Sequence, residues 1–364
     1  MGRLLTSAWN GIRRHTAEIE RQWDSFWFVP ADPTLLGLIR VCTGLMLVYT
    51  HLVWGLQLEA FFGPDAWLTP ELVETMQRDQ IAWSFWWYVP HDMLWAAHYA
   101  SITVLVLFML GVATRVTSIL SFVVVVSYIY RTPCALFGLD QVNSFLTLYC
   151  CIGPSGDAVS IDRWVRRWRA GPAANPSALK PQPSISANVA LRLIQVQMCV
   201  IYFFAGISKL LGAAWWTGDA MWLAFSNLEY QSNDMTWLVH YPWITQLMTH
   251  MTVAWELTFW SLVWKPMCRP LVLLMAVLLH VGIGACLGMW TFGLIMLVGC
   301  MSFLPPSFAN WLVDSVAAAA RACAPRLSPA TKSEAPSWSG IATGMDATGA
   351  AVDIASDGQL SKSV

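Results

Sequence analysis

Eight apolar runs, most of them close to the length that an α-helix needs to cross a lipid bilayer, recur along this chain of 364 residues. Hydrophobic residues make up 56% of the chain and charged residues only 12%, which is more apolar surface than a soluble domain of this size needs. The sequence therefore predicts an all-α polytopic membrane protein with about eight transmembrane helices. The expected spans are 35–54, 95–113, 116–130, 140–152, 187–211, 247–264, 271–287 and 290–304, of which 140–152 is short enough to be tilted or partly re-entrant.

The positions of Lys and Arg predict the orientation of these spans. With the N-terminus inside, sixteen of the 21 basic residues fall in cytoplasmic segments, and only Arg78 and Arg131 fall outside. The remaining three, Arg40, Arg192 and Lys209, lie within the spans. Because cytoplasmic loops of membrane proteins carry the excess of basic residues, both termini are expected in the cytoplasm. The net charge of -1 gives no support for nucleic-acid binding.

The two ends of the chain differ from its apolar middle. Residues 1–33 mix tryptophan and leucine with four arginines, a pattern typical of an amphipathic helix on the membrane surface, and they lack the features of a signal peptide. Residues 34–305 form the expected transmembrane domain. Residues 306–364 begin with a short amphipathic piece around 308–319 and continue as a tail rich in Ala, Ser, Thr, Gly and Pro, which we expect to be disordered and cytoplasmic.

One of the spans carries a line of polar residues. On a helix, steps of three and four bring Arg192, Gln195, Cys199, Tyr202, Gly206 and Lys209 onto a single seam. Polar groups on one seam of an intramembrane helix face protein or water, because lipid cannot satisfy them. Lys209 is therefore expected to point inward. The alternative is that Lys209 lies near the membrane surface and extends its ammonium into water along its aliphatic stem.

Other titratable residues fall inside the expected spans. Arg40 either reaches the surface or pairs with an acid or a carbonyl of a neighbouring helix, and the predicted orientation places Lys209 and His280 in the outer half of the membrane. We expect an outward-opening cavity shared by these two residues, with Glu256 as a further candidate. Since apolar surroundings disfavour a charged ammonium, such a lysine is suited to act as a general base.

The cysteines and the aromatic residues have ordinary interpretations as well. Most of the nine cysteines lie in apolar segments, where cysteine acts as a small hydrophobe, and their spacing matches no metal-ligand set, so no metal is predicted. Gly206 allows close approach of another backbone or a flat ligand, and Tyr202, Trp215 and Trp216 have rings that can stack on an aromatic molecule. The alternative for these residues is plain helix packing and an interfacial tryptophan belt.

The run VIYFFAGISKLLGAAWWTGDAM resembles the signature of the HTTM domain, the membrane domain shared by vitamin K-dependent gamma-glutamyl carboxylase and many bacterial proteins. The segment around Arg40, the segment GLDQVNSFLTLYCCIGP and the segment around His280 are also similar to the first, fourth, seventh and eighth helices of that family. The likeness extends over roughly residues 35–304. The matching residues of the signature are Tyr202, Phe203, Ala205, Gly206, Lys209, Leu210, Trp215 and Gly218.

This resemblance implies a concrete activity. The carboxylase lysine that matches Lys209 deprotonates vitamin K hydroquinone, and the oxygenated product then removes a proton from a glutamate side chain that adds carbon dioxide. Carried over, Lys209 is the base, His280 and Asn143 are catalytic neighbours, and Tyr202, Gly206, Trp215 and Trp216 bind a reduced quinone. Where the carboxylase has a histidine tied to carboxylation, however, this chain has Asn143, which forms hydrogen bonds but is neither acid nor base.

Two classes of function therefore stay open at this point. The first is a carboxylase-like lyase or quinol-oxidising enzyme of the membrane, with a quinone and a protein substrate as partners. The second is a non-enzymatic protein that binds lipid or quinone, or a helical subunit of a larger membrane assembly. For both, the resemblance and the composition favour the inner membrane of a bacterium. A transporter is disfavoured, because the sequence has no internal repeat and no paired broken helices.

Overall fold

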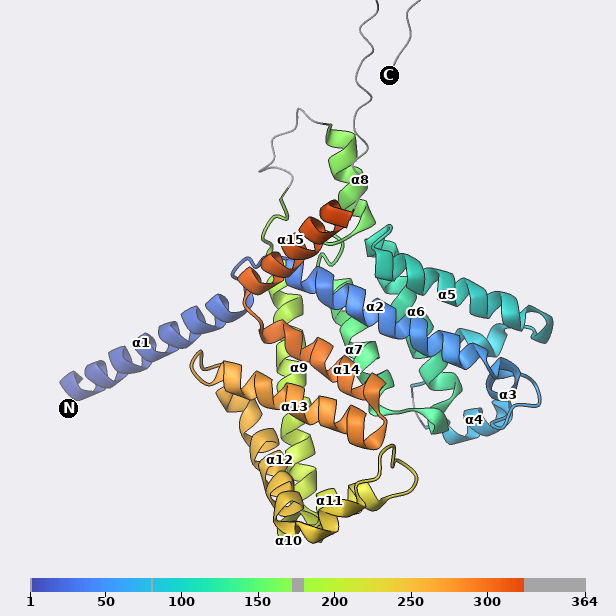
Figure 1. Cartoon of the computed structure of the whole chain (residues 1–364). Helices are drawn as coiled ribbons and strands as arrows, with labels where there is room; N and C mark the ends of the chain where they lie inside the picture. The colour runs from blue at the N-terminus through green and yellow to red at the C-terminus, as the bar shows by residue number, and fades with distance from the viewer. Residues whose placement is uncertain (1, 80, 172–179, 324–364) are drawn as a thin grey trace, which may run out of the picture. The chain divides into compact units, whose positions relative to one another are not determined.

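The computed structural model describes residues 2–79, 81–171 and 180–323. All eight apolar runs are helical (Figure 1), and their bounds agree with the expected ones to within a few residues except at the start of the sixth, which begins five residues earlier. They are α2 Thr34–Gly55, α5 Leu94–Leu110, α6 Thr114–Arg131, α7 Gly138–Ile152, α9 Ile185–Leu210, α12 Pro242–Leu262, α13 Arg269–Leu287 and α14 Trp290–Cys300. The expected disordered tail lies outside the described residues beyond residue 323.

The connecting segments also contain helices. The N-terminal segment forms α1, Gly2–Trp27, which agrees with the helix expected there, and the amphipathic piece near the C-terminus belongs to α15, Pro306–Cys323. The other α-helices are α3 Leu58–Phe62, α4 Pro70–Met76, α8 Ile161–Ala170, α10 Ala213–Thr217 and α11 Ala220–Ser226. Short 3₁₀ turns are η1 Phe85–Tyr88, η2 His91–Met93, η3 Pro133–Ala135, η4 Thr236–His240 and η5 Met301–Phe303.

Four helical segments of the described chain are long and apolar enough to cross a membrane: α2, residues 91–110 with α5, α9 and α13. A fifth is added if residues 290–303 and 306–319, which are bent by 117° to each other, count as one broken span. The helices α7 and α14 contain only 15 and 11 residues, fewer than a span ordinarily needs. The described residues are thus helical, with four or five candidate membrane spans as expected of a helical membrane protein, and the expected number of eight stays a prediction.

The long helices pack as two groups of four. In the first group α2 contacts α5, α5 contacts α6, α6 contacts α7, and α7 returns to α2. In the second group α9 contacts α12, α12 contacts α13, α13 contacts α14, and α14 returns to α9. Figure 1 shows α5 lying along α2 and α12 along α9. The two groups meet where α7 contacts α9 and where α14 contacts both α2 and α7.

Close helix packing in the second group depends on glycine. A methyl group placed on Gly206 of α9 would come within 2.9 Å of the side chain of Leu257 and within 3.1 Å of its backbone nitrogen. Because backbone atoms cannot move aside cheaply, only glycine permits α9 and α12 to approach this closely. The approach brings the residues that follow on α9 within reach of α12.

The arginine inside the first span forms part of the packing. Arg40 is fully buried in α2 and donates a hydrogen bond to the carbonyl of Val159, so of the two alternatives it adopts the pairing with a carbonyl, although that carbonyl lies in the segment between α7 and α8 and not in a helix. Its guanidinium fills the space beside Gly111, which ends α5 with φ of 73°, in the left-handed region that glycine adopts readily. Arg40 therefore joins α2 to the segment before α8.

Candidate functional site

An ion pair joins α9 and α12. The ammonium of Lys209 donates a hydrogen bond to Oε1 of Glu256 at 2.9 Å, and Oε2 lies 2.7 Å from the same nitrogen without the geometry of a hydrogen bond. The side chain of Glu256 is 8% exposed and that of Lys209 is 21% exposed. Lys209 therefore points toward the protein interior, as the polar seam predicts, and Glu256, the further candidate for its surroundings, is its counter-ion.

The aromatic residues expected around Lys209 divide into two kinds. The ammonium lies 5.1 Å from the ring centroid of Trp215, a distance at which a cation is attracted to the face of an indole. Trp216 is largely exposed and donates a hydrogen bond from its ring nitrogen to the carbonyl of Leu210. Trp215 thus lies against the ammonium from α10, whereas the ring of the next residue, Trp216, is exposed.

Tyr202 lies two turns before Lys209 on α9 and belongs to a buried cluster of its own. Its hydroxyl lies 2.7 Å from Nε2 of His280 and 3.4 Å from the sulfur of Cys300. Its ring packs edge-on against Trp255 at 4.7 Å and lies 4.4 Å from the ring of Phe259. Tyr202 is 2% exposed, so of the residues expected to stack on a quinone only Trp215 and Trp216 keep accessible ring surface.

His280 has one satisfied and one unsatisfied ring nitrogen. Nε2 is paired with Tyr202, while Nδ1 is buried and has no hydrogen-bond partner among the described residues. Lys209 and His280 are therefore not in contact with each other: Lys209 is paired with Glu256, and His280 is paired with Tyr202. All four lie on helices of the second group. The remaining seam residues also face protein, since Gln195 donates to the carbonyl of Ser302.

Asn143 belongs to a different cluster, in the first group of helices. It is 1% exposed, and both atoms of its side-chain amide lack a hydrogen-bond partner. It lines a small cavity of about 10 Å³, near the minimum that a single water requires, together with His51 and Tyr128. The hydroxyl of Tyr128 is in turn 2.7 Å from Nδ1 of His98. The structure does not join Asn143 to Lys209 or His280 by any contact among the described residues.

His51 and Tyr128 were not among the site residues predicted from the sequence. Both are polar ring residues inside apolar runs, where a titratable group needs a partner. That position was the sequence signal that could have identified them. The ring of His51 lies 4.3 Å from that of Tyr128, and its Nδ1 lies 2.8 Å from the carbonyl of Leu47. Each four-helix group therefore contains its own buried tyrosine and histidine pair.

The described residues contain no group of three or more His, Cys, Asp or Glu residues that could hold a metal ion. A cavity of about 480 Å³ lies away from Lys209, beside the end of α6, and its lining includes Arg131 and several aromatic residues. The cavity expected at Lys209 and His280 does not coincide with it.

Compared with known proteins, the chain has no significant match to any family model, curated protein or solved structure. The class of protein consequently follows from the fold alone, as a helical membrane protein with two four-helix groups.

Proposed function

We propose that this chain is an eight-span membrane protein of the HTTM type, in which Lys209 and Glu256 act as a proton-accepting pair toward a reduced quinone. The observation that carries the proposal is the ion pair itself, at 2.7 to 2.9 Å within a membrane-length helix pair. Intramembrane charges are expensive and are commonly functional, which makes this pair the strongest candidate for chemistry.

Contacts between connecting segments support eight crossings. Asp162 of α8 accepts hydrogen bonds from the turn that begins α6, and Gln77 donates to the carbonyl of Tyr130 at the other end of that helix. Similarly, Asn188 at the start of α9 donates to the carbonyl of Phe26, at the end of α1. The segments before α6 and α9 thus contact segments that the count of basic residues assigns to the cytoplasm, and the end of α6 contacts the predicted outer loop.

The proton chemistry of the pair follows from its geometry. Lys209 accepts a proton only as a neutral amine, so its own proton must first pass to Glu256, along the hydrogen bond of 2.9 Å to Oε1. One N–H bond breaks and one O–H bond forms, which leaves a neutral pair. The neutral amine of Lys209 could then accept a hydroxyl proton from a bound quinol, with a new N–H bond forming as the O–H bond of the quinol breaks. A bound quinol would supply the acidic hydroxyl. The ionised form of the quinol would be the species that reacts with dioxygen.

The residues around the pair fit the orientation of a flat ligand. Trp216 offers an exposed ring and Trp215 a half-buried one beside the ammonium. The buried hydrogen bond between Tyr202 and His280 lies in the same helix group. It would hold α9 and α13 in register. Aromatic faces next to one titratable group are typical of sites for small apolar ligands.

The test uses the full chain, purified in detergent, with vitamin K hydroquinone and dioxygen. The native protein is expected to form quinone epoxide, Lys209→Ala to lose this activity, and Glu256→Gln to retain only a small part of it. Lys265→Ala, which changes an exposed lysine in the turn between α12 and α13, is the matched control and should keep full activity. Absence of epoxide with the native chain, or equal epoxide from Lys209→Ala, would exclude the proposal.

A non-enzymatic role is the second candidate, and one observation favours it. The charge of Lys209 is already neutralised by Glu256, so the pair is also able to serve only as a link between α9 and α12. In that case the chain binds a lipid or quinone, or forms part of a larger assembly. Lys209→Ala then alters protein abundance or ligand retention, and neither the native chain nor the variant shows enzymatic turnover. Mass spectrometry of small molecules that co-purify with the native and variant chains distinguishes the two.

A further inference from the structure

The cavity of about 480 Å³ lies outside the Lys209 region and has the size of a site for a small organic molecule. It is formed by the segment that contains α3, α4, η1 and η2, together with the last residue of α6. Its inner wall consists of Phe62, Trp86 and Leu94, each no more than 7% exposed. These side chains form an apolar surface against which a hydrocarbon or aromatic body can pack.

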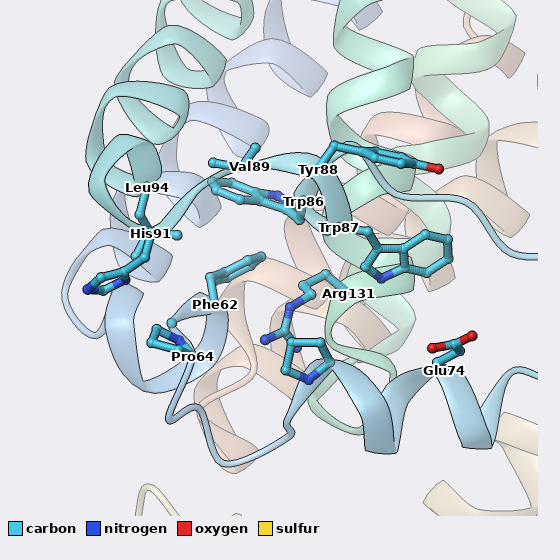
Figure 2. Close-up of a pocket in the computed structure, with 12 residues that line it drawn as sticks. Phe62, Pro64, Glu74, Trp86, Trp87, Tyr88, Val89, His91, Leu94 and Arg131 are labelled. Atoms are coloured by element: carbon cyan, nitrogen blue, oxygen red, sulfur yellow. The ribbon is translucent and has the colours of Figure 1, made fainter.

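A single arginine lines this apolar region. Arg131 is 1% exposed, and in Figure 2 its guanidinium lies between Phe62 and Trp87. Nη1 donates a hydrogen bond to the carbonyl of Leu68 at 2.9 Å, and the guanidinium carbon lies 5.9 Å from the ring centroid of Phe62. These two contacts hold the side chain in one orientation.

The second terminal nitrogen of Arg131 has no hydrogen-bond partner in the part of the chain that the structure describes. Nη2 is buried and makes no hydrogen bond, and none of the ion pairs among the described residues involves this arginine. The charge of Glu71 acts on Arg131 from outside the cavity lining but forms no ion pair with it, so the Nη2 donor itself stays unsatisfied, which is costly for a buried group. A carboxylate or a phosphate oxygen in the cavity would supply the missing acceptor, and arginine is the side chain best suited to these anions.

The rim of the cavity has the opposite character. Glu74 of α4 lines the cavity with an exposed side chain, and Figure 2 shows its carboxylate below the ring of Trp87. Trp87 and Tyr88 are exposed aromatic residues of η1. A carboxylate beside aromatic faces attracts an ammonium group, through charge and through the negative face of each ring. The cavity therefore offers a positive group inside and a negative group at its mouth.

We propose that this cavity binds a small zwitterion, with its anionic oxygens at Nη2 of Arg131 and its ammonium at Glu74 and Trp87. The apolar part of the ligand packs against Phe62 and Trp86. The site is separate from Lys209 and does not depend on the proposed quinol chemistry. Two sources supply the same chemistry: the headgroup of a zwitterionic lipid, or a free amino acid with an apolar side chain.

Binding of charge-matched probes to the full chain in a non-ionic detergent tests the proposal by calorimetry. Phosphoethanolamine represents the lipid headgroup and L-phenylalanine the free amino acid. Methyl phosphate and ethanolamine each carry only one of the two charges. At least one zwitterion should bind about tenfold more tightly than either single-charge probe, because it engages both ends of the cavity. The zwitterion that binds identifies the source. Failure of both zwitterions to bind at millimolar concentration would overturn the proposal.

Variants of the rim separate the two ends of the site without disturbing the buried arginine. Glu74→Gln should weaken the bound zwitterion about fivefold, the size expected for a partly exposed charge pair, and should leave binding of methyl phosphate unchanged. Trp87→Ala should weaken the zwitterion as well. The matched controls are Glu229→Gln and Trp67→Ala, an exposed acid and an exposed tryptophan that do not line the cavity. Equal effects of Glu74→Gln and Glu229→Gln would contradict the assignment of the ammonium end.

Discussion

The ammonium of Lys209 lies 2.7 Å from one carboxylate oxygen of Glu256 and 2.9 Å from the other, so the two charges of α9 and α12 neutralise each other inside the protein. Two opposite charges in weakly polar surroundings attract strongly, but each has also lost its hydration. The pair is therefore costly to break on one side and much less costly to remove as a whole.

This asymmetry gives the first prediction. Lys209→Met leaves the carboxylate of Glu256 buried without a counter-ion and should lower the free energy of unfolding by about 3 kcal/mol. The double variant Lys209→Met, Glu256→Leu removes both charges and should recover most of that loss. Unfolding of the purified protein in mixed detergent measures both values. If the double variant is no more stable than the single one, the ion pair does not account for the loss.

Two glycines of neighbouring helices give the second prediction, with one as the control for the other. Gly206→Ala places a methyl group 3.1 Å from the backbone nitrogen of Leu257 and should destabilise the protein by about 2 kcal/mol. Gly282 in α13 has no heavy atom within 4 Å of the same position, so Gly282→Ala should be neutral or stabilise the helix by up to about 1 kcal/mol. Thermal unfolding compares the two variants. Equal stability of both would show that α9 and α12 do not pack this closely.

The positions of the long helices could be predicted from the sequence because hydrophobic runs are a local property. The polar seam of α9 was equally local, since a period of three to four residues places Tyr202 and Lys209 on one face. The structure confirms that both face protein. The pairing of Arg40 with a carbonyl was one of two local alternatives, and the structure decides between them.

Contacts between distant segments could not be predicted in this way. Glu256 and Asn143 were both assigned to the surroundings of Lys209, but only Glu256 lies there, because α7 belongs to the other four-helix group. Arg131 was counted only as a basic residue of an outer loop, although α4 and η1 enclose it. No periodicity records which loop folds over which helix end, since that depends on the packing of the whole chain.

A carboxylate outside the spans gives a prediction of pH dependence. Asp162 accepts hydrogen bonds of 2.8 Å from the backbone of Thr114, from its hydroxyl and from the backbone of Ala113. Burial acts to raise the pKa of Asp162, but these hydrogen bonds, first those from Thr114, outweigh it and the pKa is lowered. A lowered pKa in the folded state stabilises the protein above the pKa of the unfolded state, about 3.9, and this contribution is lost as the pH falls through the folded value.

Asp162→Asn should therefore cost about 1 kcal/mol at neutral pH, similar to the loss of a helix cap. The difference between the native and variant chains should shrink as the pH falls below about 4, where the carboxyl takes up a proton in the unfolded state, and its charge-dependent part should be lost once the pH is below the lower pKa of the folded state. Chemical unfolding at a series of pH values measures this difference. Asp157→Asn, which changes an acid of the preceding turn, is the control. A difference that stays constant down to acid pH would assign the loss to shape alone.

The buried pair of Tyr128 and His98 gives the last prediction. The hydroxyl of Tyr128 lies 2.7 Å from Nδ1 of His98, and the two residues join α5 to α6 in the first helix group. Tyr128→Phe leaves the ring packing in place but removes the partner of a histidine that is 1% exposed, so it should destabilise the protein by about 2 kcal/mol. Tyr99→Phe changes a tyrosine of α5 that is 60% exposed and should have almost no effect. The free energies of unfolding of both variants test this. Tyr128 contributes no atom to the pair of Lys209 and Glu256. Folded Tyr128→Phe protein should therefore form as much epoxide as the native chain. Equal stability of the two tyrosine variants would mean that the hydrogen bond between α5 and α6 is not formed.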